Sequence, residues 1–294
     1  MSAVAYVALR RSARTRPATN APRAIASLAA NSLRLEVATW PKPGLVSHRD
    51  TGSHHDMDAQ TFYRSAAAIE PFFRTLVAAG MQNADMATLR DIGIDAERAM
   101  LAVTEGVNTH RGAIFGMGLL CAAAGLRLAG HASHARSLGN LVSDRWGHDI
   151  LVPSRKEPSH GDVARHRFGA GGARHEAAYG FPTVYQIGLR ALAQATHLAP
   201  GDPEAQRVHA CFALIAVLED TNLLYRGGAE GLSFARDAAR RFIDAGGVGR
   251  AWWQKEAIAI HRQFVARHLS PGGAADLLSL SLFLRDLQRT GWAP

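Results

Sequence analysis

The sequence predicts an all-α protein, and three features of its composition and patterning support this fold class. Ala and Leu, both strong helix formers, dominate the chain, whereas aromatic residues make up only 7% of it. Sustained alternation of apolar and polar residues between Asn-Gly or Asp-Gly turns, which is typical of β-hairpins, is missing. No low-complexity linker follows residue 23. We therefore expect a single compact multi-helix catalytic domain over residues 23–294.

Short turns that contain Gly, Pro or Asn divide this domain into helical stretches. The expected helices span residues 23–39, 57–79, 85–104, 111–129, 131–146, 182–197, 203–219, 229–245, 249–268 and 271–290.

Prolines mark two of the helix boundaries. Pro41 and Pro43 end the first helix, because proline cannot continue the hydrogen-bond ladder and restricts the residue before it. The loop around Lys42 is therefore expected to be stiff. Near the C-terminus, Ser270 precedes Pro271, which predicts a hydroxyl cap followed by a proline at the first helical position.

Residues 112–126 are apolar or glycine throughout and lie between Arg111 and Arg127. This stretch is shorter than the ~20 residues that a membrane span needs. The sequence therefore predicts a central buried helix and no association with a membrane.

Residues 147–181 interrupt the helical pattern with many glycines and prolines and are dense in Arg and His. A loop this long is usually either functional or disordered. One interpretation is a lid that closes over a polyphosphate through Arg165, Arg167, Arg174 and His175. The other is a poorly ordered surface loop.

The excess positive charge is concentrated at the N-terminus. The formal net charge is +8, and residues 1–35 contain six arginines and no acidic residue. This distribution gives little support for a basic face that binds nucleic acid. Residues 1–22 are expected to be a disordered basic extension rather than an organellar transit peptide.

Cys121 and Cys211 lie in apolar helical contexts without Cys-x-x-Cys spacing. They are expected to be buried thiols in a reducing compartment. No apolar stretch typical of a secretory signal follows the N-terminal arginines, so a cytoplasmic location is expected. The sequence leaves a homo-oligomer open.

Three polar segments interrupt the helices at residues 41–58, 106–112 and 220–231. Each combines glycines, which let a backbone approach a ligand closely, with amide, cationic and carboxylate groups. A phosphate-rich substrate held together with a metal ion needs these residue types. We therefore expect the three segments to form one active site.

The first segment offers Lys42 and His54 as substrate contacts and ends with Asp56 and Asp58 before the next helix. Asp56 could be the N-cap of that helix, or it could help to hold Mg²⁺, because hard cations bind carboxylate and phosphate oxygens together. The histidines of this segment do not match a zinc signature.

The second segment places Asn108, His110 and Arg111 at the N-terminus of the buried helix. Unpaired N–H groups and the helix dipole favour an anion there, which predicts a phosphate site. The alternative is an ordinary capped helix with a solvated arginine.

The third segment has Asp220 and Asn222 near the end of one helix and Glu230 in the first turn of the next. Arg226 and the glycines Gly227 and Gly228 lie between these carboxylates. Glu230 could simply complement the helix dipole. The chain has neither a Walker A sequence nor a strand-associated Gly-x-Gly-x-x-Gly, so the common nucleotide-binding folds are disfavoured.

Six motifs together resemble the triphosphoribosyl-dephospho-CoA synthase family, which serves malonate decarboxylase and citrate lyase. They occur in the family order at residues 41–46, 52–58, 106–115, 180–182, 220–232 and 270–278. Thr39-Trp40, before the first motif, is closer to the malonate decarboxylase branch. Two positions depart from the family pattern: Arg111 stands where Lys is expected, and Tyr225 where His is expected.

The resemblance implies a glycosyl transfer from ATP to 3′-dephospho-CoA. The 2′-hydroxyl of dephospho-CoA would attack the anomeric carbon of the ATP ribose, release adenine and keep the triphosphate intact. The product is the precursor of the prosthetic group of an acyl carrier protein. By analogy with inverting glycosidases, two carboxyl groups should flank the reacting bond.

The expected roles follow from this reaction. Glu230, Asp220 and Asp276 are the candidates for acid/base catalysis, and Asp56, Asp58 and Asp220 are the candidates for Mg²⁺ ligands. Candidates for substrate and phosphate contacts are Lys42, His54, Asn108, His110, Arg111, Asn222, Arg226, Gly227 and Gly228.

Two other functions fit the same residues. A Mg²⁺-dependent nucleotide or ADP-ribosyl hydrolase on an all-α fold would use water in place of the dephospho-CoA hydroxyl. A helical nucleotide-sensing module would bind through the same loops without a reaction.

Overall fold

The structure of the protein is a computed structural model that describes residues 20–152 and 171–290. Within these ranges it consists of helices and turns without a β-strand, which confirms the all-α prediction. The helices are α1 (Ala21–Val37), α2 (Ala59–Met81), α3 (Met86–Val103), α4 (Arg111–Leu128), α5 (Leu138–Leu151), α7 (Gly172–Ala178), the π-helical turn η2 (Val184–Gly188), α8 (Leu189–Leu198), α9 (Pro203–Val217), α10 (Thr221–Asp244), the 3₁₀ turn η3 (Gly247–Gly249), α11 (Trp253–Ala266) and α12 (Gly272–Arg289).

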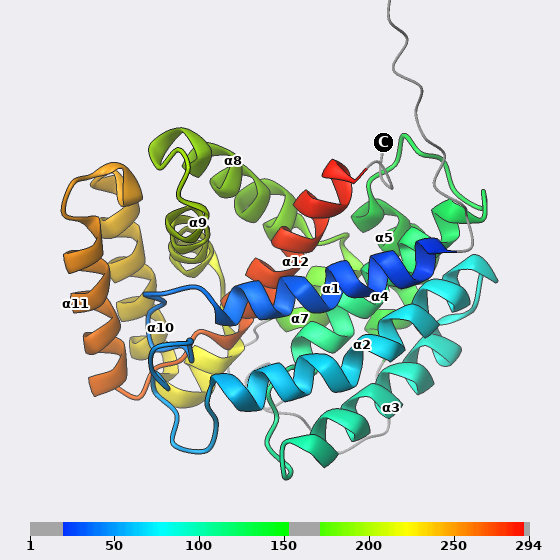
Figure 1. Ribbon diagram of the computed structural model, residues 1–294, viewed down its shortest axis with the longest axis horizontal. Helices are drawn as coiled ribbons and strands as arrows, with labels where there is room; N and C mark the ends of the chain where they lie inside the picture. The colour runs from blue at the N-terminus through cyan, green and yellow to red at the C-terminus, as the bar shows by residue number, and fades with distance from the viewer. Residues whose placement is uncertain (1–19, 153–170, 291–294) are drawn as a thin grey trace, which may run out of the picture.

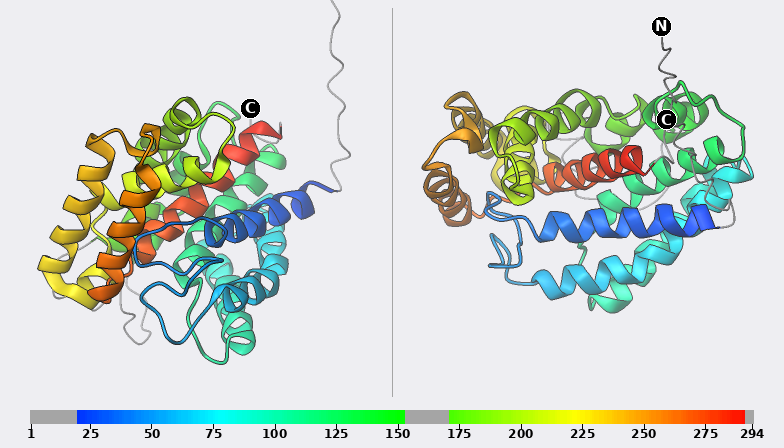
Figure 2. Two further views of the ribbon diagram at one scale, coloured as in Figure 1. Left: turned by 60° about the vertical axis from the view of Figure 1, so that its left-hand side comes forward. Right: turned by 45° about the horizontal axis from the view of Figure 1, so that its top comes forward.

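The helices form two packed groups joined by α12. In the first group, α2 packs against α1, α3 and α4. In the second group, α9 packs against α8 and α10, and α11 lies beside α10 at the end of the molecule (Figures 1 and 2). α12 contacts α1 and α4 on one side and α9 on the other. The start of α12 therefore lies where both groups can contribute to a site.

α4 is the central helix that the sequence predicts. It has the length and hydropathy of a membrane span, but 78% of it is buried inside the fold. Its apolar residues surround the helix instead of forming one stripe, as expected for a helix enclosed by others. Cys121 on α4 and Cys211 on α9 are both buried and free, in agreement with the prediction.

The segment between α5 and α8 differs from the prediction. α5 begins at Leu138, seven residues later than expected, because Ser137 caps it by accepting a hydrogen bond from the Asn140 N–H at 3.0 Å. The short helix α7 was not predicted at all. Arg165 and Arg167, two of the expected lid contacts, lie outside the described residues.

The third polar segment is helical rather than a loop. Asp220 is the N-cap of α10, which starts at Thr221, and Gly228 bends the helix with φ 61° and ψ −161°. A backbone with this positive φ suits glycine, which explains Gly228. The helix start predicted at residue 229 is therefore confirmed, because α10 consists of two helical stretches that meet at the kink of Gly228.

The cap predicted at Ser270 is wrong. α12 begins at Gly272, its N-cap residue is Pro271, and the Ser270 hydroxyl does not cap it. The Ser270 hydroxyl lies 2.9 Å from Nε2 of His54 instead. Ser270 therefore joins the loop before α2 to the start of α12.

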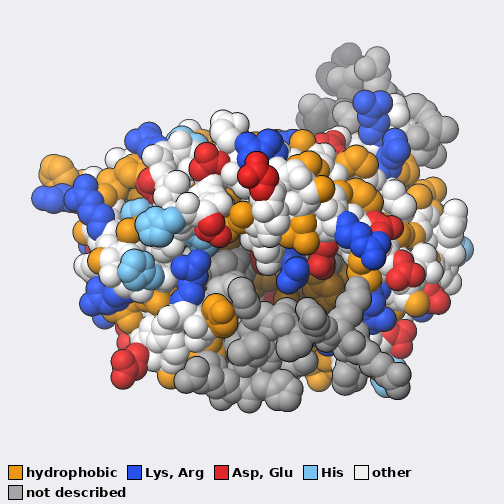
Figure 3. Space-filling model, turned by 90° about the horizontal axis from the view of Figure 1, so that it is seen from below, with side chains coloured by type: hydrophobic (Ala, Val, Ile, Leu, Met, Phe, Trp, Pro, Cys, Tyr) orange, Lys and Arg blue, Asp and Glu red, His pale blue; other side chains and the backbone are white. Residues whose placement is uncertain are grey.

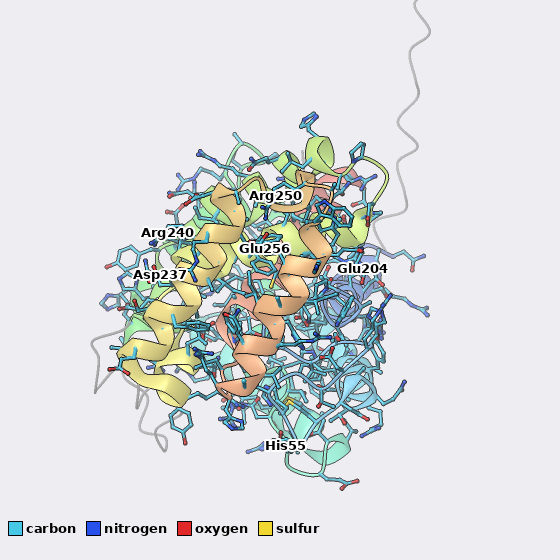
Figure 4. All side chains as sticks on the ribbon, turned by 90° about the vertical axis from the view of Figure 1, so that its left-hand side faces the viewer. His55, Glu204, Asp237, Arg240, Arg250 and Glu256 are labelled. Carbon is cyan, nitrogen blue, oxygen red and sulfur yellow. The ribbon has the colours of Figure 1, made fainter. Side chains whose placement is uncertain are left out.

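The loop after α1 is fixed from α9, which explains the positions of Thr39 and Trp40. The Trp40 N–H donates a hydrogen bond to Oε1 of Glu204 at 3.0 Å. Arg207 donates from Nε to the Thr39 hydroxyl at 2.7 Å. Figure 4 shows Glu204 on this side of the molecule, beside the outer helices α10 and α11.

The outer surface of α10 and α11 carries ion pairs that contribute little to stability. Asp237 and Arg240 pair at 3.2 Å with both side chains about half exposed, and Arg250 pairs with Glu256 (Figure 4). Exposed pairs of this kind are typically worth less than about 1 kcal/mol. The apolar core, not this surface, holds the second helix group together.

α2 and α4 cross at close range because glycine occupies each helix at the contact. A Cβ atom at Gly80 would lie 1.9 Å from the carbonyl oxygen of Ala122. A Cβ atom at Gly125 would lie 2.0 Å from the carbonyl oxygen of Val77. Both obstacles are backbone atoms, so a side chain at either glycine would push the helices apart.

We predict that Gly125→Ala lowers the free energy of unfolding by roughly 1–3 kcal/mol, the usual cost of overpacking. Gly93→Ala on α3 is the matched control, since a Cβ atom there meets nothing within 4 Å. That control should raise stability by about 0.5–1 kcal/mol. Urea denaturation of both variants measures the difference, and a Gly125→Ala protein as stable as wild type would contradict the close crossing.

Candidate active site

A cavity of about 1930 Å³ lies between the two helix groups. It is larger than the ~300–1,000 Å³ typical of a site for one drug-sized ligand, so it has room for two nucleotides. Figure 3 shows the hollowed face, with basic and acidic side chains around it. All three polar segments contribute to its walls, together with α3, α7 and the start of α12.

Asp276 brings a carboxyl group into the cavity wall against the first turn of α4. A Cβ atom at residue 112 would lie 2.1 Å from Oδ2 of Asp276, so Gly112 is what permits this approach. The Ala113 N–H donates a hydrogen bond to the Asp276 carboxylate. The N-terminus of α4, which was expected to bind phosphate, thus already faces a carboxylate.

The pKa of Asp276 is raised well above its ordinary value. Burial is the largest cause, and the nearby carboxylates of Asp220 and Glu36 add to it, while the hydrogen bond from Ala113 opposes it. A carboxyl group with a raised pKa in a cleft is suited to accept or donate a proton near neutral pH. Of the three candidate catalytic carboxylates, Asp276 has the environment that this role requires.

Asp220 is buried and holds two helices together. Its Oδ1 accepts hydrogen bonds from the N–H groups of Asn222 at 2.8 Å and Leu223 at 3.3 Å, at the start of α10. Its Oδ2 accepts from the Ala274 N–H on α12 at 2.9 Å. Burial raises the pKa of Asp220, and these hydrogen bonds oppose the shift. Asp220 lines the cavity, but both of its oxygens already serve the backbone.

Lys42 does not reach the cavity, contrary to the predicted phosphate contact. Its side chain is completely buried and forms an ion pair with Glu36 on α1. His261 donates from Nδ1 to the Lys42 carbonyl oxygen at 2.7 Å and fixes the backbone there. Burial raises the pKa of Glu36, and the Lys42 ammonium lowers it. The ammonium therefore favours the ionised form of the Glu36 carboxylate.

His54 and Arg226 meet at the opposite wall. Arg226 donates from Nη1 to the carbonyl oxygens of Ser53 at 3.3 Å and His268 at 3.1 Å, and its Nη2 lies 3.3 Å from Nδ1 of His54. Because a guanidinium can only donate, Nδ1 of His54 is the acceptor and Nε2 carries the proton toward Ser270. Burial and the Arg226 charge lower the pKa of His54. His54 is therefore a neutral group beside a cation.

Asn108 and Arg111 hold the start of α4 and also line the cavity. Oδ1 of Asn108 accepts a hydrogen bond from the Arg111 N–H at 3.1 Å. Arg111 donates from Nε to Oε2 of Glu97 at 3.1 Å, and its side chain is 42% exposed. Asn108 thus satisfies the first N–H of α4, whose N-cap residue is His110, while Arg111 keeps a cation at the wall.

His110 lines the cavity but is not a cation. It is 4% exposed, and burial together with the Lys42 charge lowers its pKa to about 3. At neutral pH its imidazole is uncharged. A phosphate contact at this position would therefore be a hydrogen bond from a neutral ring.

Besides Lys42, four predicted site residues lie away from the cavity lining, namely Asp58, Gly227, Gly228 and Glu230. Glu230 is exposed on α10, beyond the bend at Gly228, so its carboxylate does not reach the cavity. Gly227 serves packing, since a Cβ atom there would lie 2.6 Å from the Leu269 side chain. Asp58 is the N-cap of α2 and accepts from the N–H and the hydroxyl of Thr61, both at 2.8 Å. The cap is thus Asp58 and not Asp56.

Several cavity residues were missed by the sequence analysis. Arg90 and Glu97 project from α3, and Glu176 projects from α7. Arg90 and Glu97 lie far from any glycine-rich segment, so no local motif indicated them. Glu176 lies within the glycine-rich segment 147–181, of which only the Arg and His residues were considered. Arg174 and His175, expected in the lid, do line the cavity. Asn222 lines it as well, 2.7 Å from the place of a Cβ atom at Gly272.

The described residues 20–152 and 171–290 bring together no group of three His, Cys, Asp or Glu side chains that could hold a metal ion. Of the predicted ligands, Asp58 and Asp220 are occupied as helix caps. Asp56 lines the cavity with a side chain that is 61% exposed. One free carboxylate fits the way Mg²⁺ is held in nucleotide sites, mainly by phosphates and water.

We predict that Lys42→Met lowers the free energy of unfolding by about 3–5 kcal/mol, because it leaves the buried Glu36 charge without a partner. The double variant Glu36→Gln, Lys42→Met should recover much of this loss. Thermal and urea denaturation measure both. A Lys42→Met protein of normal stability that merely binds substrate more weakly would restore Lys42 as a phosphate contact.

Comparisons with known proteins identify the family of this chain. The profile of the family described as ATP:dephospho-CoA triphosphoribosyl transferase matches residues 22–294. A protein of Pectobacterium atrosepticum named 2-(5''-triphosphoribosyl)-3'-dephosphocoenzyme-A synthase is 44% identical over 268 residues, which cover 87% of this chain and 86% of the relative. A protein of Acinetobacter calcoaceticus named as a probable enzyme of the same kind is 36% identical over 263 residues, 89% of this chain and 90% of the relative. No solved structure gives a significant match. The chain therefore belongs to the ATP:dephospho-CoA triphosphoribosyl transferases, a family of transferase enzymes that use ATP and dephospho-CoA as substrates.

Proposed function

We propose that this protein transfers the 5-triphosphoribosyl group of ATP to the 2′-hydroxyl of 3′-dephospho-CoA. The bond between the anomeric carbon and N9 of adenine breaks, and a bond from that carbon to the 2′-oxygen forms. A base takes the proton of the 2′-hydroxyl, and the departing adenine takes a proton from solvent.

The position of Asp276 is the observation that carries this proposal. It lies at the start of α12, between the start of α4, which holds Arg111, and the start of α10, which leads to Arg226. The transfer needs a base where two riboses meet and a cation on each side for the phosphates of each substrate. This arrangement supplies both within one cavity.

We assign the general base to Asp276. Its pKa is raised by burial and by the neighbouring carboxylates of Asp220 and Glu36, which makes its carboxylate a stronger base. Within residues 20–152 and 171–290, the Ala113 N–H is the backbone donor to Asp276, whereas both oxygens of Asp220 accept backbone hydrogen bonds. Asp220 then acts as a positioning residue that fixes the start of α12.

We assign the phosphate contacts to Arg111 and Arg226, and Arg90 on α3 also lines the cavity. One of the two walls would bind the triphosphate of ATP and the other the diphosphate of dephospho-CoA. Guanidinium groups suit both because they offer several donors in a planar fork.

Mg²⁺ would enter as a complex with ATP, with Asp56 as a ligand from the protein. The ion supplies neutralisation of the triphosphate charge when it is bound. Asp56 suits this role because it is exposed and lies beside His54 and Arg226 on the cavity wall, with the Nδ1–Oδ1 distance to His54 at 3.5 Å.

We further propose that the product passes to the acyl carrier protein of malonate decarboxylase in the cytoplasm. The Thr39-Trp40 pair supports this branch over the citrate lyase branch. Loading of a purified apo acyl carrier subunit of each enzyme, in the presence of its own holo-transferase, tests the assignment. Product that serves only the citrate lyase pathway would contradict it.

Purified protein with ATP, Mg²⁺ and dephospho-CoA should release adenine in an amount equal to the coupled product, measured by chromatography. The reason is that the cavity holds both substrates over one base. Adenine released at the same rate without dephospho-CoA would indicate a hydrolase. Release of ADP or phosphate without adenine would contradict glycosyl transfer altogether.

Asp276→Asn should lower kcat by about 10²–10⁴-fold, the usual contribution of a general base, while the fold persists. Glu230→Gln, an equally conservative change on the exposed part of α10, should leave turnover near wild type. Circular dichroism of both variants controls for folding. Loss of turnover in Glu230→Gln with normal turnover in Asp276→Asn would reverse the assignment.

The pH dependence of kcat distinguishes whether Asp276 acts as a general base or as a general acid. A base must be ionised, and the pKa of Asp276 is raised, so kcat should fall as the pH falls through a value above the ordinary range of Asp. Asp276→Asn should lose this acidic limb. A rate that instead falls with rising pH over the same range would make protonated Asp276 a general acid.

A further inference from the structure

The imidazole of His110 has one ring nitrogen, Nε2, that is buried without a hydrogen bond to the described residues. Nε2 has no hydrogen-bond partner within the part of the chain that the structure describes, although the ring is 4% exposed. The ring lines the cavity at the start of α4. A buried polar atom without a partner costs free energy, so an atom kept in this state at a cavity wall suggests a ligand that satisfies it.

A hydroxyl relay leads to the other ring nitrogen of His110, Nδ1. The Thr109 hydroxyl lies 2.7 Å from Oγ of Ser65 and donates to it. Oγ of Ser65 lies 2.7 Å from Nδ1 of His110. While it accepts from Thr109, Ser65 keeps one proton to donate. In the tautomer in which Ser65 donates this proton to Nδ1, the proton of the neutral imidazole is on Nε2, and our proposal uses this tautomer.

The surroundings keep this imidazole neutral and favour an uncharged ligand. The ring packs edge to face against Phe62, with centroids 5.0 Å apart. Ile114 and Leu119 continue the apolar wall. The ammonium of Lys42, the cation that lowers the pKa of His110, is paired with Glu36 in the interior. A flat heterocycle fits such a wall better than a phosphate does.

We propose that Nε2–H of His110 donates a hydrogen bond to a ring nitrogen of the adenine that leaves ATP. This proposal rests on the proposed transferase function. When the bond from the anomeric carbon to N9 breaks, its electron pair spreads over the purine nitrogens. His110 stabilises that charge and keeps its own proton, while adenine takes its proton from solvent. A neutral imidazole has this role as a hydrogen-bond donor in other enzymes.

The test combines substitutions of His110 with analogues of ATP that lack one acceptor, 3-deaza-ATP and 7-deaza-ATP. His110→Leu removes the donor, whereas His110→Gln keeps a neutral N–H near the place of Nε2. With ATP, kcat should fall roughly 10²-fold in His110→Leu and much less in His110→Gln. With one of the two deaza analogues as substrate, His110→Leu and the wild type should have similar kcat values, because that analogue lacks the ring nitrogen that accepts the hydrogen bond from His110. His197→Leu on the exposed side of α8 is the control and should have no effect.

Ser65→Ala tests the relay. It frees Nδ1 from its donor, so the other tautomer becomes available and kcat with ATP should fall. The fall should be smaller with the same deaza analogue. An unchanged kcat in Ser65→Ala would overturn the tautomer assignment.

Two results would overturn the proposal. In one, His110→Leu slows ATP and both analogues by the same factor. In the other, His110→Lys has the activity that His110→Leu lacks, because a lysine can replace a histidine that contacts phosphate but not one that donates to adenine. If wild type releases adenine only with dephospho-CoA, the transferase function stands even when the His110 proposal fails.

Inhibition of the wild type by free adenine, 3-deazaadenine and 7-deazaadenine gives a second readout, which holds even if His110→Leu does not fold. One of the deaza compounds should bind about tenfold more weakly than adenine, the usual scale of one lost hydrogen bond. Equal inhibition by all three compounds would overturn the proposal.

Discussion

The carboxylate of Asp220 joins the first turns of α10 and α12, and the geometry of the site depends on that junction. It accepts backbone hydrogen bonds from Asn222 on one helix and from Ala274 on the other. Two residues further along α12, Asp276 is thereby held against Gly112 at the start of α4. Three helix N-termini thus converge, and the dipoles of their first turns help to hold two carboxylates in a buried place.

The same convergence concentrates negative charge under the cavity. Burial raises the pKa values of Glu36, Asp220 and Asp276, and the first two carboxylates raise the pKa of Asp276 further. Lys42 is the buried cation that lowers the pKa of Glu36. Lys42 therefore acts on the site as a buried charge beneath the cavity and not as a substrate contact. The exposed cations Arg111 and Arg226 remain at the walls, where phosphates of the substrates can reach them.

Local sequence patterns predicted most of the helices, because runs of apolar residues and single glycines determine where a helix forms or breaks. Continuous apolar residues between Arg111 and Arg127 identified the buried helix α4. The break at Gly228 was predicted correctly, although residues 221–227, which were expected to be a loop, are helical. The grouping of the three polar segments followed from their shared residue types, and residues of all three line one cavity.

The directions of side chains could not be predicted in the same way. Lys42 resembles a phosphate contact in the sequence because it lies among Pro and Gly, but Glu36, six residues earlier, holds it in the interior. Glu230 follows a glycine pair, yet the bend at Gly228 leaves it on the outer surface. Arg90 reaches the cavity from the middle of a helix that carries no motif. Tertiary packing decides each of these cases.

The most direct test of the site is a crystal structure with dephospho-CoA and an unreactive ATP analogue bound together. We expect the 2′-oxygen of dephospho-CoA to lie within about 2.6–3.2 Å of the Asp276 carboxylate. We also expect the phosphates of the two substrates to lie on opposite walls, one set at Arg111 and the other at Arg226. Two riboses that meet away from Asp276, or both phosphate groups on the same wall, would contradict this arrangement.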